Sequence, residues 1–139
     1  MKSAGYSGTP LIQKLGIQPG MRIYIQGAPE GYAVTLGPLP QAVTALQRLG
    51  QELDFIHFFT RQAKQLEERL PALKAALDYD GMLWISWPKK AAKVATDVDE
   101  NLVRQLGLRA GLVDVKIAAV DETWSGLKFV YRLEDRPDV

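Results

Sequence analysis

The residues best suited to chemistry follow apolar, strand-like runs, at the points where loops begin. Lys89 and Lys90 come directly after such a run and could bind a phosphate or a carboxylate. Trp87 and Trp124 could form a flat platform for an aromatic or sugar-like ligand. Together the candidate ligand-binding residues could bind an anion, stack on a ring and transfer a proton. They are Glu30, Arg61, Trp87, Lys89, Lys90, Asp121, Glu122, Trp124 and Ser125.

A structural role is the favoured interpretation for each of these groups. The two lysines fit a solvated loop, because exposed charges contribute little energy. Asp121 and Glu122 are adjacent and point to opposite sides in an extended chain, so they are poorly placed as an acid and base pair. They fit a polar hairpin loop, with an ion pair to Lys89 or Lys90 as an option. The two tryptophans fit the closed end of a core.

The remaining candidates also favour structural roles. His57 is the only histidine and lies within an apolar run, which favours a hydrogen-bonded core imidazole over a general base. The lack of Cys excludes thiol chemistry and disulfides, and without a second His a transition-metal site would need carboxylates alone, which is disfavoured. Residues 7–10 (SGTP) could hold an anion at a helix start, but helix capping is favoured. No nucleotide-loop, nucleophile-elbow, kinase or zinc signature occurs, so no cofactor is predicted.

Length and charge limit the class of protein. The 139 residues fit one α/β domain, 1–139, with an arm and short helix at 1–20 and a polar tail at 133–139. The 17 basic and 16 acidic residues give a net charge of +1, which argues against nucleic acid or an anionic membrane as partner. No signal-peptide or membrane-spanning run is present, so we expect a cytoplasmic protein.

Helical and strand-like patterns alternate along the chain. The pattern predicts a three-layer Rossmann-like sandwich, with a mostly parallel sheet of about five strands and an antiparallel last strand. Pro71 is expected to bend or split its helix. The predicted elements are helix 10–15, strand 21–26, loop 27–40 with room for a helical turn, helix 40–49, strand 53–59, helix 61–77, a turn at Asp80-Gly81, strand 82–87, helix 97–110 capped by Thr96 or Asp97, and strands 113–120 and 127–132.

This topology gathers the candidate residues at one edge of the sheet. Ligands of parallel α/β sheets lie beyond the carboxyl ends of the strands, and so the loops there are expected to converge. The segments concerned are 27–31, 60–61, 87–90 and 121–126. An end strand of the sheet, near 21–26 or 113–120, could also pair with a second copy of the chain as a homodimer.

Four sequence blocks resemble an uncharacterised bacterial family, the domain of unknown function numbered 3052. They are residues 4–10 (AGYSGTP), 15–21 (LGIQPGM), 87–90 (WPKK) and 120–128 (VDETWSGLK). This resemblance covers almost the whole chain and implies no activity.

Residues 53–132 also resemble the second half of the class I S-adenosylmethionine-dependent methyltransferase fold. In that fold a glycine-rich turn after the first strand and an acidic residue at the end of the second hold the cofactor. Here residues 26–31 (QGAPEG) contain no G-x-G pattern, and Pro29 lacks a backbone donor. The second and third strands of that sheet, with the acidic residue, are expected to be missing, and no cofactor residues are carried over.

These observations lead to two hypotheses of function. The first is a non-catalytic ligand-binding or protein-interaction domain of shortened methyltransferase-like fold. The alternative is a small enzyme or sensor that binds an anionic or aromatic metabolite at the strand ends, through Lys89, Lys90, Asp121, Glu122 and Trp124.

Overall fold

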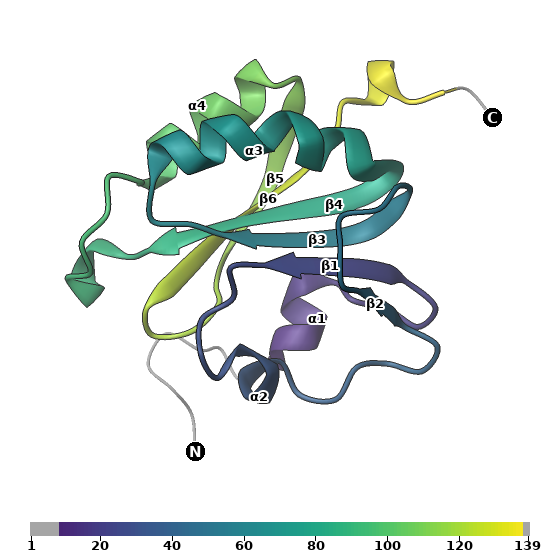
Figure 1. The fold of residues 1–139 in the computed structure, drawn as a ribbon, viewed down its shortest axis with the longest axis horizontal. Helices are drawn as coiled ribbons and strands as arrows, with labels where there is room; N and C mark the ends of the chain where they lie inside the picture. The colour runs from purple at the N-terminus through teal and green to yellow at the C-terminus, as the bar shows by residue number, and fades with distance from the viewer. Residues whose placement is uncertain (1–8, 138–139) are drawn as a thin grey trace.

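The computed structural model describes residues 9–137, so the predictions made for Ser7 and Gly8 lie outside the described residues. Figure 1 shows the order of the elements along the chain. They are α1 (Leu11–Leu15), β1 (Arg22–Gln26), α2 (Tyr32–Leu36), β2 (Thr44–Leu46), β3 (Leu53–Phe59), α3 (Ala63–Ala76), β4 (Leu77–Pro88), the 3-10 helix η1 (Lys90–Ala92), α4 (Glu100–Arg109), β5 (Leu112–Ala119), β6 (Trp124–Tyr131) and the 3-10 helix η2 (Leu133–Asp135).

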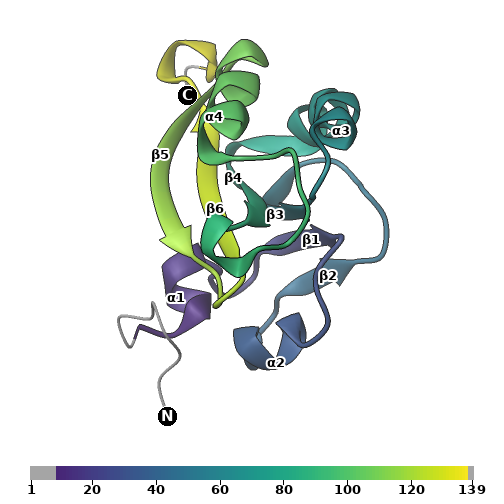
Figure 2. The same ribbon diagram turned by 90° about the vertical axis from the view of Figure 1, so that its left-hand side faces the viewer.

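The strands form one six-stranded sheet in the order β2-β1-β3-β4-β6-β5. The first four strands run parallel, and β6 is antiparallel to both β4 and β5. Helices α3 and α4 cover one face of the sheet and α1 and α2 the other (Figures 1 and 2). The three-layer fold with an antiparallel last strand is therefore confirmed, although the sheet has one strand more than expected.

Strand β3 carries the centre of the core on both of its faces. Phe55, Ile56 and Phe58 are fully buried, as the nearly continuous apolar run predicted. Ile56 and Phe58 pack in the cluster under α3 and α4, whereas Phe55 and Phe59 pack in the cluster over α1 and α2. Because burying each such side chain contributes about 1.5–3 kcal/mol, this strand fixes the position of its neighbours.

Residues 40–49 contain only a short strand, β2 (Thr44–Leu46), and the helix predicted there is wrong. Val43 packs against the cluster on the α1 and α2 side, whereas Leu46 and Leu49 pack against the cluster on the other face. The three side chains therefore share no helical face. Ala42 has a φ of 63°, which a continuous α-helix does not permit. Strand β2 pairs in parallel with β1, so the second strand that was expected to be missing is present.

Strand β4 is longer than predicted and begins directly after α3. Asp80 and Gly81 lie inside it rather than in a turn. The register with β3 jumps there, because Leu53 pairs with Leu77 and the next pair is Phe55 with Met82. A Cβ atom on Gly81 would lie 2.6 Å from the Leu53 carbonyl oxygen, so the irregularity depends on glycine.

The helices differ from their predicted bounds mainly at their ends. Pro71 lies inside α3, which continues unbroken through it, so the helix is not split there. Helix α4 begins at Glu100, three residues later than expected. Among the described residues, no helix combines the length and apolar character needed to cross a bilayer.

Of the two strands expected to pair with a second copy of the chain, only one lies at an edge of the sheet. Strand β1 has a neighbour on each side, so the prediction that residues 21–26 form an end strand is wrong. Strand β5 lies at the edge of the sheet (Figure 2). A register shift between Asp114 and Lys116 interrupts this edge, and such bulges oppose pairing between sheets. Self-association through β5 stays a prediction.

Candidate functional site

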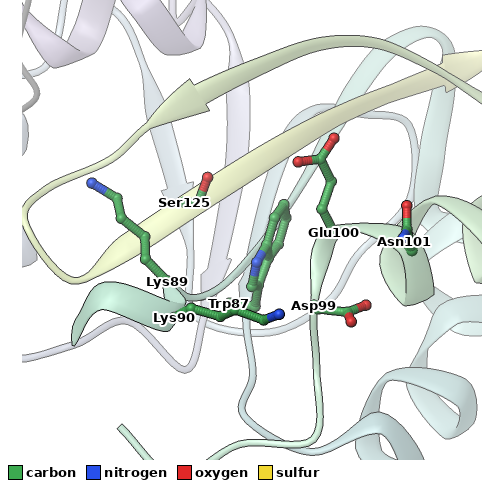
Figure 3. Close-up of a pocket in the computed structure, with 7 residues that line it drawn as sticks. All are labelled: Trp87, Lys89, Lys90, Asp99, Glu100, Asn101 and Ser125. Atoms are coloured by element: carbon green, nitrogen blue, oxygen red, sulfur yellow. The ribbon is translucent and has the colours of Figure 1, made fainter. Parts of the chain in front are cut away.

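A cleft of about 400 Å³ opens at the carboxyl end of β4 (Figure 3). We call it the Trp87 cleft. A second hollow of about 330 Å³ shares Trp87, Lys90 and Asp99 with it and continues along the loop that leads to α4. The cleft is lined by Trp87, Lys89, Lys90, Asp99, Glu100, Asn101 and Ser125. Four of these were predicted from the sequence: Trp87, Lys89, Lys90 and Ser125.

The floor of the cleft comes from two neighbouring strands. Trp87 in β4 is paired with Ser125 in β6, and the Trp87 side chain is only 5% exposed. The indole therefore offers little area to a ligand, while the Ser125 hydroxyl can donate or accept a hydrogen bond. The amide of Lys89 donates to the carbonyl of Thr123 at 2.8 Å, which ties the start of the lysine loop to the β5–β6 hairpin.

The opposite wall of the cleft is the start of α4. Asp99 is the N-cap, and its Oδ1 accepts a hydrogen bond from the Leu102 amide at 2.9 Å. The prediction that Thr96 or Asp97 caps this helix is therefore wrong. Sequence reasoning placed Asp99 and Glu100 as capping-box partners and missed them as cleft residues, and it missed Asn101 altogether. The signal that could have found them is that the start of the predicted helix follows the end of the strand at 82–87 along the chain.

Thr96 and Asp97 instead fasten the cleft wall to the turn between β3 and α3. The Thr96 hydroxyl donates to the Arg61 carbonyl at 2.7 Å. The Asp97 Oδ1 accepts from the Ala63 amide at 2.8 Å, so Asp97 satisfies a free amide in the first turn of α3. These contacts fix the loop from β4 to α4, so the wall of the cleft is formed before any ligand arrives.

Some charged groups around the cleft form ion pairs and others do not. Glu100 forms an ion pair of 2.7 Å with Arg104, whose Nε also lies 2.9 Å from the Asp114 carboxylate. Hydrogen bonds to these two carboxylates raise the pKa of the Arg104 guanidinium. Neither Lys89 nor Lys90 forms an ion pair within residues 9–137. The two ammonium groups end on opposite sides of the indole in Figure 3. The cleft therefore offers two ammonium groups that have no ion pair in the described chain, beside the Asp99 carboxylate that caps α4.

The predicted tryptophan platform is not formed. Trp124 pairs with Pro88, the residue after Trp87, so the two rings lie at the same end of the sheet. However, Trp124 packs against Phe59 at a ring distance of 5.3 Å on the α1 and α2 side, while Trp87 belongs to the cluster under α3 and α4. The sheet lies between the two rings, and so they cannot hold one ligand.

The other predicted site residues lie outside the Trp87 cleft. The Asp121 Oδ1 accepts hydrogen bonds from the amides of Thr123 and Trp124 at 2.8 and 2.7 Å, as a hairpin turn requires. This confirms the hairpin interpretation of Asp121. The ion pair suggested between the hairpin acids and the lysine loop is not formed among the described residues. The residues that do not line this cleft are Glu30, Arg61, Asp121, Glu122 and Trp124.

His57 is a core residue, as predicted. Its Nδ1 lies 2.8 Å from the Tyr32 hydroxyl and its Nε2 lies 2.7 Å from the Ser86 hydroxyl. Either neutral tautomer is satisfied, because both hydroxyls can donate or accept. The imidazole has no exposed surface, and this burial lowers its pKa to about 3. His57 therefore stays neutral at ordinary pH and holds α2 against the sheet through Tyr32.

The turn after β1 is held tightly against β3. Gly27 has a φ of 75°, and a Cβ atom there would lie 2.6 Å from the Phe59 carbonyl oxygen. Pro29 follows and offers no amide, and Tyr32 covers the strand end with only 5% of its surface exposed. After β2, residues 46–51 (LQRLGQ) contain no Asp or Glu. Gly27 therefore allows the close contact between the turn after β1 and the end of β3.

Comparisons with known proteins identify the fold alone. No family model matches the chain, and no curated protein matches it. The magnesium protoporphyrin IX methyltransferase of Synechocystis PCC 6803, solved with bound S-adenosylmethionine, is similar over 88% of this chain and 74% of its own, with 12% identity and a TM-score of 0.60. A methyltransferase from Aquifex aeolicus is similar over 86% of both chains, with 15% identity and a TM-score of 0.58. Fibrillarin from Aeropyrum pernix, with natively bound S-adenosylmethionine, is similar over 91% of this chain and 70% of its own, with 14% identity and a TM-score of 0.55.

Proposed function

We propose that this chain is a ligand-binding domain of methyltransferase-like fold that holds a small anionic metabolite in the Trp87 cleft and does not transfer methyl groups. One observation carries the proposal. Lys89 and Lys90 reach the cleft without an ion-pair partner in the described part of the chain, whereas Glu100 is paired with Arg104 and Asp99 caps α4. An anion entering the cleft beside Lys90 gains a charge-assisted contact and displaces no internal salt bridge.

The size and lining of the cleft favour a small molecule. Its volume of about 400 Å³ lies near the lower end of the usual range for ligand pockets. The edge of Trp87 supplies an apolar contact, and the Ser125 hydroxyl supplies a polar one that can fix the orientation of a ligand. The wall around Asp97 and Asp99 is already fixed by hydrogen bonds, so binding orders few additional groups.

The residues at the usual cofactor position of this fold do not fit S-adenosylmethionine. The one close-approach glycine, Gly27, faces Phe59 rather than an open cradle. Pro29 removes an amide from the turn, and the five residues that follow β2 include no carboxylate to accept hydrogen bonds from a ribose. The Gly27 contact and Pro29 support a domain that has the fold without its customary cofactor.

A methyltransferase is the competing candidate, because similar structures contain S-adenosylmethionine. Isothermal titration of the full chain with S-adenosylmethionine and S-adenosylhomocysteine separates the two. The proposal expects no saturable heat with either compound. A micromolar isotherm for either would remove it.

The anion site is tested with inorganic phosphate, glucose 6-phosphate, AMP and citrate in a thermal-shift screen, with glucose and adenosine as uncharged controls. At least one anion should raise Tm, and a stabilising anion is then titrated by calorimetry. Lys90→Gln should weaken binding about fivefold or more, as expected for loss of a charge-assisted contact. Lys64→Gln, an exposed lysine on α3, serves as the matched control and should bind like the natural chain. Equal affinity of both variants, or a screen in which no anion raises Tm, would refute the site.

A further inference from the structure

Three lysines meet on the other face of the sheet, beside the end of α1. Lys116 in β5 is directly opposite Lys128 in β6 in the antiparallel register. The Lys116 ammonium donates to the Lys14 carbonyl at 3.1 Å, and the Lys14 ammonium donates to the Ala119 carbonyl at 2.8 Å. We call Lys14, Lys116 and Lys128 the lysine cluster. It draws one side chain from each of three elements, so the fold itself assembles it.

The cluster has an electrostatic cost in the isolated molecule. Like charges directly opposite each other on neighbouring strands destabilise a sheet. Burial, and then the charge of Lys116, lower the pKa of Lys128. Burial, and then the charges of Lys116 and Lys89, lower the pKa of Lys14. The described chain therefore holds like charges together at a place where water screens them only in part.

Lys128 is the most unusual member of the cluster. It is partly buried, and its ammonium forms no hydrogen bond and no ion pair with any residue of the described range 9–137. On its other side it pairs with Trp84, whose indole is fully buried and donates to the Leu15 carbonyl at 2.9 Å. A cation that is partly removed from water usually has a polar partner in the protein.

Within residues 9–137, no carboxylate forms an ion pair with Lys116 or Lys128. Both ion pairs of residues 9–137 involve Arg104, which belongs to α4 on the opposite face. The Asp121 carboxylate is occupied by the two amides of the hairpin turn. Residues 1–8 (MKSAGYSG) contain no Asp or Glu. The described residues thus leave the charges of Lys116 and Lys128 without a carboxylate partner, which favours a negatively charged ligand.

We propose that the lysine cluster is a second anion site that binds a compact oligophosphate group of a small molecule. Several ammonium groups from separate elements suit a ligand with several negative oxygens within a short span, because lysine binds phosphate as a point charge. Lys89, which lines the Trp87 cleft, also acts electrostatically on Lys14. Since the net charge of the whole chain is only +1, a long polyanion such as nucleic acid gains no general attraction.

Calorimetric titration of the full chain with sodium tripolyphosphate tests the site. Lys128→Gln should weaken binding about fivefold or more, and Lys116→Gln should do the same if the first variant fails to fold. Lys64→Gln should leave the affinity unchanged. Tripolyphosphate can also enter the Trp87 cleft, so Lys90→Gln should weaken only that binding event and Lys128→Gln only the binding to the lysine cluster. A failure of the proposed function and a failure of this site therefore give different patterns. Loss of tripolyphosphate binding in Lys90→Gln but not in Lys128→Gln would overturn the second site.

Thermal stability without ligand provides an independent readout. In chloride buffer, Lys128→Gln should raise Tm because it removes a repulsive cross-strand pair. Tripolyphosphate should then raise the Tm of the natural chain more than that of the variant. A lower Tm for Lys128→Gln with unchanged tripolyphosphate affinity would show that the lysine is structural. Tighter binding of a single-stranded oligonucleotide than of tripolyphosphate at physiological salt would replace a small-molecule site by a nucleic-acid surface.

Discussion

Mild acid should destabilise this protein through His57. The imidazole is fully buried, and its pKa is lowered to about 3 in the folded chain, compared with about 6.5 when it is exposed in the unfolded chain. Because the folded pKa is lower, the unfolded chain binds the additional proton first as the pH falls. The contribution of a neutral His57 to stability is therefore complete above about pH 6.5 and is lost progressively toward pH 3.

The size of the effect follows from the two pKa values. Linkage between protonation and unfolding lowers the free energy of unfolding by about 2 kcal/mol between pH 7.5 and pH 5. Ordinary carboxylates contribute little in that interval, since their pKa values lie near 4. Urea titrations at the two pH values, followed by tryptophan fluorescence, measure the difference directly.

The matched variant is His57→Gln, which cannot titrate but can still hydrogen-bond to Tyr32 and Ser86. Its absolute stability is free to differ, because only the change between the two pH values is compared. That change should fall close to zero in the variant. A natural chain that is equally stable at pH 7.5 and pH 5 would refute the reasoning. So would a variant whose free energy of unfolding also falls by about 2 kcal/mol between them.

Two further substitutions test the turn after β1 and the wall of the cleft. Gly27→Ala should cost about 2 kcal/mol or more, because its Cβ would lie 2.6 Å from the Phe59 carbonyl oxygen, whereas Gly31→Ala, with open space around it, should cost only the backbone strain of about 1 kcal/mol. Urea denaturation that ranks the two equally would contradict this geometry. Asp99→Ala should lower the stability by about 1 kcal/mol through loss of the α4 cap. It should also tighten calorimetric binding of an anion in the Trp87 cleft, since a carboxylate is removed, and weaker binding would count against a cationic cleft.

The buried strands could be predicted from local pattern alone. Residues 53–59 were predicted as a strand with the bounds that β3 has, because an uninterrupted apolar run suits a strand covered on both faces. Strand β6 begins three residues before its predicted start, at Trp124. Gly126 had indicated a loop, but it packs where a Cβ atom would lie 3.0 Å from the Ser86 hydroxyl. The long-range pairing with β4 therefore overrides the local turn signal.

Residues 40–49 show where local pattern misleads. Val43, Leu46 and Leu49 have helical spacing, yet they pack on different faces of a sheet. Only the presence of β1 beside the segment explains why it is extended. Likewise, Asp97 has the type and position of a helix cap, but the amide that it satisfies belongs to α3. Pairings of this kind depend on tertiary structure and leave no local signal.

The candidate site was predictable on one side only. Loops after strands point to the carboxyl edge of a parallel sheet, and this correctly places Trp87 and Lys90 at that edge. Which face of the sheet each side chain occupies depends on the register between strands. The sequence predicts Trp124 beside Trp87 because both lie at the same edge of the sheet. The pairing of β4 with β6 instead puts the two rings on opposite faces.

The bond between Asp97 and the start of α3 also bears on the order of folding. The Ala63 amide and the Asp97 carboxylate are 34 residues apart, and Thr96 reaches Arg61 across 35 residues. Contacts across such a separation close large loops, so we expect them to form after α3 and β4, which lie between them, have docked. Breaking them should accelerate unfolding and leave the refolding rate nearly unchanged. The lifetime of the folded chain thus depends on Thr96 and Asp97, which also fix the wall of the Trp87 cleft.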